Sequence, residues 1–214
     1  MKAKKRGRIG LLVNNKGFTL IEIAIVLIII GIIIGAVVKG KDIVRSAEQK
    51  RIYSKFLNSW EVAYNTYYDR TGWILGDIDE DDNDDGTVGG GRDGKCFTTG
   101  ATCAHLVSQL ERVGLKAPSK GPTGSECVRQ YTDSTGERHV FTISFLNVDT
   151  APNHFNYIEI DSIPIEVGIA WDRIIDGEMD GDTGDFLYWP AGGATDWPDV
   201  TTTNSGRAVL KLSF

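Results

Sequence analysis

The chain has 214 residues, enough for one domain of ordinary size with an appendage. Its formal net charge is −6, but residues 1–17 hold six basic and no acidic side chains, so the remainder carries −12. Because binding to a phosphate backbone needs a surplus of cations, we expect no nucleic-acid partner.

The first predicted element is an apolar helix over residues 18–38, whose only ionisable side chain is Glu22. At about 1.5 Å per residue this helix would be about 30 Å long, the thickness of a bilayer's hydrocarbon core. The basic residues before it are expected to stay in the cytoplasm, so the chain after Lys39 would lie on the far side. A secretory signal peptide is the alternative, but its apolar region has only about 7–15 residues and ends in a small-residue cleavage site.

The stretch KGFTLIE resembles the processing site of type IV prepilins and pseudopilins. A basic leader ends at Gly17, Phe18 begins an apolar helix, and Glu22 is the fifth residue from Phe18. The resemblance implies that a prepilin peptidase removes residues 1–17 and that the new amine of Phe18 is methylated. It also implies that Glu22 pairs with this amine on a neighbouring subunit of a helical filament. Such pairing has a physical reason, since unpaired charge is unfavourable in an apolar medium.

The helical pattern continues beyond the apolar run. Residues 39–70 are amphipathic, with an apolar and aromatic stripe that includes Tyr53, Trp60 and Tyr67. We therefore predict one helix from about Phe18 to Asp69 whose second half packs this stripe onto a separate head, with Thr71-Gly72 as its end.

An acidic loop follows this helix, with seven acids among residues 77–85. Asp81, Asn83 and Asp85, followed by Gly86, match the first part of an EF-hand calcium loop. The twelfth position is Arg92, where the EF-hand needs a bidentate Glu, so a true EF-hand is not expected. A looser calcium loop and a solvated acidic loop both remain open.

The rest of the chain, residues 71–214, is predicted to form an α+β head. Amphipathic spacing predicts short helices within 103–119 and 163–177, and alternating apolar residues predict strands within 126–132, 138–146, 154–160 and 207–214. A long N-terminal helix packed on a small antiparallel β-sheet follows, which agrees with the pilin lollipop that the resemblance implies.

A second acidic loop follows the helix predicted within 163–177. Its candidate calcium ligands are the acids spaced mostly two apart, Asp176, Glu178, Asp180, Asp182 and Asp185. The surrounding segment also resembles a pilin and pseudopilin segment, in Ala170, Asp172, Ile175, Asp176, Thr183 and Gly184. Gly177 and one extra residue before Thr183 depart from that pattern, so both a Ca²⁺ site and a solvated turn remain open.

The three cysteines, Cys96, Cys103 and Cys127, allow one disulfide with one thiol left over, and the pairing stays open. The three histidines, His105, His139 and His154, stand far apart, and no catalytic motif frames any of them. We therefore expect no enzyme activity and, Ca²⁺ apart, no cofactor.

The expected function is that of a structural subunit of a type IV pilus-like filament. The expected partners are prepilin peptidase, the inner membrane and other copies or related pilins. The precursor would cross the bacterial inner membrane once with its head in the periplasm. One alternative is a pseudopilin of a type II secretion system, and another is a calcium-dependent adhesin displayed on a pilin stalk.

Overall fold

The computed structural model describes residues 17–77, 103–133, 135–150 and 153–213. The chain divides into two compact units, Met1–Val44 and Arg45–Phe214. The predicted loop ligands Asp81, Asn83 and Asp85 lie outside the described residues, as does Cys96.

The predicted long helix is present as two consecutive helices, α1 (Leu20–Lys55) and α2 (Leu57–Thr71). Phe56 departs from helical geometry between them, with φ −123° and ψ −79°. The hydroxyl of Ser59 donates to the carbonyls of Lys55 at 2.9 Å and Phe56 at 2.8 Å. Side-chain bonds of this kind often bend helices, and the sequence pattern did not predict the irregularity at Phe56.

The end of α2 is where the sequence predicted it. Gly72 has φ +71°, a left-handed conformation that suits glycine, and its N–H donates to the carbonyl of Tyr68 at 2.7 Å. The predicted stop at Thr71-Gly72 is therefore confirmed.

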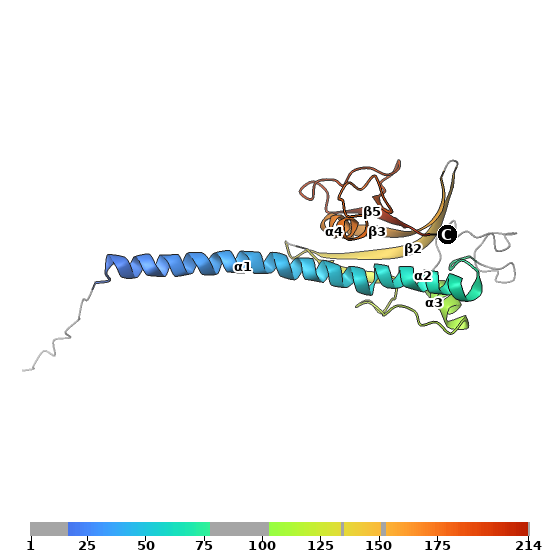
Figure 1. The fold of residues 1–214 in the computed structure, drawn as a ribbon, viewed down its shortest axis with the longest axis horizontal. Helices are drawn as coiled ribbons and strands as arrows, with labels where there is room; N and C mark the ends of the chain where they lie inside the picture. Colours follow the sequence, from blue (N-terminus) through green and yellow to red (C-terminus); the bar gives the residue numbers. More distant parts are fainter. Residues whose placement is uncertain (1–16, 78–102, 134, 151–152, 214) are drawn as a thin grey trace, which may run out of the picture. The chain divides into compact units, whose positions relative to one another are not determined.

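Five antiparallel strands form one sheet in the order β1-β2-β3-β5-β4, and Figure 1 labels β2, β3 and β5 of this sheet. The strands are β1 (Val128–Thr132), β2 (Arg138–Thr150), β3 (Asn153–Pro164), β4 (Phe186–Tyr188) and β5 (Ser205–Lys211). Strand β1 lies within a predicted segment, β2, β3 and β5 overlap predicted segments and extend beyond them, and β4 was not predicted. The two predicted short helices are present as α3 (Cys103–Arg112) and α4 (Ile165–Ile175).

Alternation along the strands places apolar side chains on one face of the sheet. We call this the inner face, because the aromatic residues of the long helix pack against it. Ile143 lies opposite Ile160, and Phe145 lies opposite Ile158. All four are buried, as the alternation Phe141-Ile143-Phe145 predicted for β2.

The aromatic stripe of the helices packs on this inner face. Phe56 contacts Phe141 edge to face with ring centroids 5.9 Å apart, and Trp60 contacts Phe145 at 5.7 Å. Tyr64 stacks on the same Phe145 at 5.9 Å. The predicted α+β architecture of a long helix on a small antiparallel sheet is confirmed.

Helix α4 is held against the C-terminal part of α1. The indole of Trp171 is fully buried and donates to the carbonyl of Gln49 at 3.1 Å. Its ring also contacts Tyr53 and Phe141 at centroid distances of 6.1 Å and 5.8 Å. Trp171 therefore joins α4, α1 and β2 in one core.

A disulfide joins Cys103, at the start of α3, to Cys127, next to β1. The prediction of one bridge is confirmed, and the pairing that the sequence left open is Cys103–Cys127.

Removing this bridge should destabilise the chain. Its cysteines are 24 residues apart, and a loop of this size corresponds to about 3 kcal/mol of unfolded-state entropy. Cys127→Ser in the full chain in detergent should therefore lower the free energy of urea unfolding by roughly that amount. The control Cys96→Ser should leave it unchanged, and equal effects of the two substitutions would contradict the assignment.

Candidate assembly site and carboxylate clusters

Glu22 lies in the first turn of α1, with Gly17 and Phe18 just ahead of the helix. The N–H of Glu22 donates to the Thr19 hydroxyl at 3.3 Å, and the N–H of Thr19 donates to the Glu22 carboxylate at 3.4 Å. This reciprocal pair is a capping box, and its signature Thr-x-x-Glu is visible in the sequence, although we had not predicted it. Glu22 therefore has a role within its own helix.

The apolar run from Phe18 to Val38 exposes its apolar side chains on all sides of the helix. The large apolar residues from Phe18 to Val38 are between 46% and 92% exposed. Among the described residues, one helix is long and apolar enough to cross a membrane, and its best window has a mean hydropathy of 3.1. Because exposure of so much apolar surface to water is unfavourable, this surface requires lipid or other protein chains around it.

The second acidic loop uses its carboxylates to hold its own backbone. Asp176, at the end of α4, accepts hydrogen bonds from the N–H of Asp185 at 3.0 Å and of Phe186 at 2.8 Å. The hydroxyl of Thr183 donates to Asp180 at 2.6 Å. Within the described residues, no three of the predicted ligands Asp176, Glu178, Asp180, Asp182 and Asp185 bring carboxylate oxygens within 4.8 Å of one another.

Asp172 is a buried carboxylate beside this loop that the predicted ligand set left out. It is fully buried on α4 and accepts hydrogen bonds from the indole N–H of Trp197 at 2.6 Å and from the N–H of Gly181 at 3.1 Å. Burial is the largest cause that raises the pKa of its carboxyl, the nearby charges of Asp176 and Asp180 add to it, and the two hydrogen bonds lower it, so that the pKa is about 6. The Oδ1 atoms of Asp172 and Asp180 are buried without a hydrogen-bond partner in the described part of the chain.

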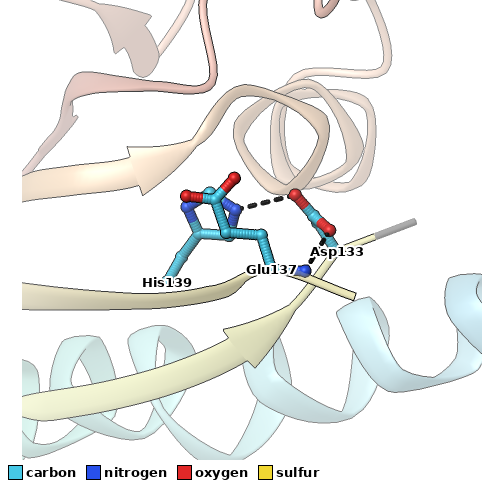
Figure 2. Close-up of side chains that lie close together, drawn as sticks. All are labelled: Asp133, Glu137 and His139. Atoms are coloured by element: carbon cyan, nitrogen blue, oxygen red, sulfur yellow. Dashed lines mark hydrogen bonds and ion pairs between the residues drawn. The ribbon is translucent and has the colours of Figure 1, made fainter. Parts of the chain in front are cut away.

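A second cluster lies where β1 turns into β2, and Figure 2 shows its three side chains, Asp133, Glu137 and His139. One ligand atom from each lies within 4.8 Å of the other two. His139 Nε2 is 2.9 Å from Asp133 Oδ2. The hydrogen bond with His139 has the largest effect on the pKa of Asp133, and the bond from the Thr135 hydroxyl has the next largest. These bonds hold the pKa of Asp133 well below its usual range.

Sequence reasoning missed this second cluster. We considered His139 only for its distance from the other histidines. The available signal was its position six residues after Asp133, on the second of two predicted strands whose short connection would bring the ends of a hairpin together.

Comparison with known proteins identifies the N-terminal segment. Residues 12–38 match the family model of the prokaryotic N-terminal methylation motif, which is the type IV prepilin-type signature. The resemblance recognised in Lys16–Glu22 is therefore confirmed, and the match covers the apolar helix and none of the head. Neither a curated protein nor a solved structure matches the chain. The motif and the apolar helix fit a membrane-anchored precursor.

The raised pKa of the buried Asp172 predicts how the stability of the chain depends on pH. Its pKa of about 6 in the folded chain lies above the carboxyl's ordinary 3.8, so the folded state binds this proton more readily than the unfolded state. The stability contributed by Asp172 should therefore rise as the pH falls from about 7 to about 4, by roughly 2 to 3 kcal/mol.

Urea unfolding of the full chain in detergent with EDTA tests this, comparing wild type with Asp172→Asn. The free energy of unfolding of wild type minus that of the variant should increase by about 2 kcal/mol between about pH 7.5 and about pH 4.5. A difference that does not change with pH would contradict the assigned shift.

Proposed function

We propose that this chain is a structural subunit of a type IV pilus-like filament, matured by prepilin peptidase and assembled through its N-terminal helix. The observation that carries the proposal is the methylation-motif match over residues 12–38, on a helix that exposes apolar side chains on every side. Peptidase cleavage after Gly17 would create a charged amine at Phe18. The filament would then cover the apolar surface that lipid covers in the precursor.

The motif and the fold favour a structural over a catalytic role. The precursor is proposed to cross the bacterial inner membrane once, with residues 1–17 in the cytoplasm because of their basic side chains. The head would then lie in the periplasm, or on the cell surface after assembly.

Glu22 is proposed to neutralise the Phe18 amine of a neighbouring subunit. Its carboxylate lies at the start of the apolar run, where an unpaired charge packed among helices is unfavourable. Pairing with a neighbour would fix the axial register between helices while adding little net stability.

Variants of Glu22 and Thr19 separate this pairing from the capping role. Glu22→Gln keeps a capping-box side chain but removes the charge, whereas Thr19→Ala removes the cap hydroxyl and keeps the charge. Glu22→Gln and Glu22→Ala should insert into the membrane normally but lower the yield of sheared filaments more than about tenfold, because one unpaired buried charge costs roughly 3–5 kcal/mol.

Thr19→Ala serves as the matched control, and its loss of about 1 kcal/mol of capping should leave filaments near the wild-type yield. Normal filament yield from Glu22→Gln would show that capping alone explains the carboxylate and would contradict the pairing.

The runner-up is a pseudopilin of a type II secretion system, which would use the same maturation and assembly. The genes next to the one that encodes this chain distinguish the pilus subunit from the pseudopilin. A secretin gene with a retraction ATPase gene indicates pili, and a full secretion operon indicates a pseudopilin.

A cation-binding head, as in a calcium-dependent adhesin, is a second candidate supported by the second acidic loop. The supporting observation is two buried carboxylate oxygens, on Asp172 and Asp180, that have no hydrogen-bond partner among the described residues. Oxygen ligands of this kind suit Ca²⁺, and its charge would offset the repulsion from Asp176 and Asp180 that, after burial, raises the pKa of Asp172. Asp176, Glu178, Asp182 and Asp185 remain candidates for the further ligands.

Thermal melting of the full chain in detergent during a Ca²⁺ titration tests this site. A Ca²⁺ concentration a hundredfold above Kd should stabilise the chain by about 2.7 kcal/mol, and Asp180→Asn should reduce this effect. The control Asp161→Asn, an exposed acid on β3, should preserve it. No stabilisation at millimolar Ca²⁺ would contradict the site.

A further inference from the structure

The turn between β1 and β2 holds a mixed set of metal-binding groups, apart from the N-terminal motif and from the second acidic loop. Asp133 directly follows β1, Glu137 directly precedes β2, and His139 is the second residue of β2. The antiparallel pairing of Thr132 with Arg138 brings these three residues together. One imidazole and two carboxylates therefore meet at one end of a hairpin (Figure 2).

The carboxylate of Asp133 is held in a fixed orientation. Its Oδ1 accepts from the N–H of Thr135 at 2.8 Å, the hydroxyl of Thr135 at 2.7 Å and the N–H of Glu137 at 2.9 Å. These three bonds leave Oδ2 directed at His139. Outer hydrogen bonds of this kind are what orient a carboxylate that ligates a metal.

Asp133 Oδ2 and His139 Nε2 have the separation of two ligands of one ion. They are 2.9 Å apart, and their side chains are only 14% and 9% exposed. With metal–ligand distances of about 2.0–2.2 Å, two adjacent donors of a single ion lie about 3 to 3.5 Å from each other, close to the separation observed here. An ion would replace the hydrogen bond between them once one side chain turns so that both atoms face the ion instead of each other.

Glu137 supplies the third donor from the open side of the turn. Its side chain is exposed, so it is free to move toward an ion, and its carboxylate already lies within 4.8 Å of both other ligand atoms. Water would complete the coordination on the same side. Imidazole nitrogen with carboxylate oxygen suits first-row divalent metals, whereas Ca²⁺ takes six to eight oxygens.

We propose that Asp133, Glu137 and His139 form a binding site for a first-row divalent transition-metal ion such as Zn²⁺. The competing explanation is that Asp133 and His139 form an ion pair that only closes the hairpin. The two explanations differ on Glu137. A closed hairpin needs its backbone N–H, which bonds Asp133, and a metal site needs its carboxylate.

Calorimetric titration of the full chain in detergent with ZnCl₂ tests the proposal. The protein is treated with a chelator, carries no polyhistidine tag, and has Cys96→Ser throughout so that a thiol cannot supply a ligand. Wild type should bind one Zn²⁺ at this site. His139→Gln and Glu137→Gln should each weaken its affinity at least about tenfold, since even residues that only orient metal ligands cost 10–100-fold when replaced.

Glu137→Gln should still fold, because it leaves the backbone N–H in place. The melting temperature of the metal-free chain should therefore not change. The control His105→Gln removes an imidazole on α3 and should leave Zn²⁺ affinity unchanged. Millimolar Ca²⁺ should not displace the Zn²⁺, which separates this site from the second acidic loop. The proposal is overturned by absence of Zn²⁺ binding, by equal affinity in wild type and Glu137→Gln, or by displacement with Ca²⁺.

Discussion

The burial of one helical stripe against the inner face of the sheet is the constraint on which the head depends. Phe56, Trp60 and Tyr64 are all fully buried, and each contacts an aromatic ring of β2. Burying an aromatic side chain of this size is worth a few kcal/mol, and edge-to-face pairs add to it. Without the helix, the apolar face of a five-stranded sheet would be open to water.

Other elements of the head are arranged around this contact. Trp171 inserts from α4 beside Phe141 and bonds to the backbone of α1, and the Cys103–Cys127 disulfide ties α3 to the approach of β1. The acidic loop after α4 and the β1–β2 turn lie at the ends of these fixed elements. This is why both can hold polar side chains in defined positions.

Most of the fold could be predicted because the chain has two clear periodicities. The aromatic residues of 39–70 repeat at helical spacing, and Phe141, Ile143 and Phe145 alternate at strand spacing, so both buried faces can be read locally. Strand β4 has three residues, too few to show a period, and its place beside β5 depends on pairing. The irregularity at Phe56 is confined to one residue, and helical periodicity does not reveal a departure of that kind.

The candidate sites also differed in how far the sequence predicted them, because some are local in the sequence and others form only on folding. Gly17, Phe18 and Glu22 form a contiguous motif, so their relation is visible in the sequence. Asp172 stood out in the sequence only through the resemblance of its segment, and its burial depends on folding, which surrounds it with Trp197 and the loop backbone. His139 meets Asp133 only because a hairpin closes. The acids of the second loop were visible as a group, but the sequence could not show that Asp176 would bind backbone N–H groups.

The central claim is that residues 1–17 are a leader and that Phe18 becomes the charged end of an assembly helix. It is tested most directly by the intact mass and N-terminal sequence of the protein purified from cells with an active prepilin peptidase. We expect wild type to begin at an N-methylated Phe18, and a variant with Gly17 replaced to keep residues 1–17. Wild-type protein that retains residues 1–17 would contradict the account.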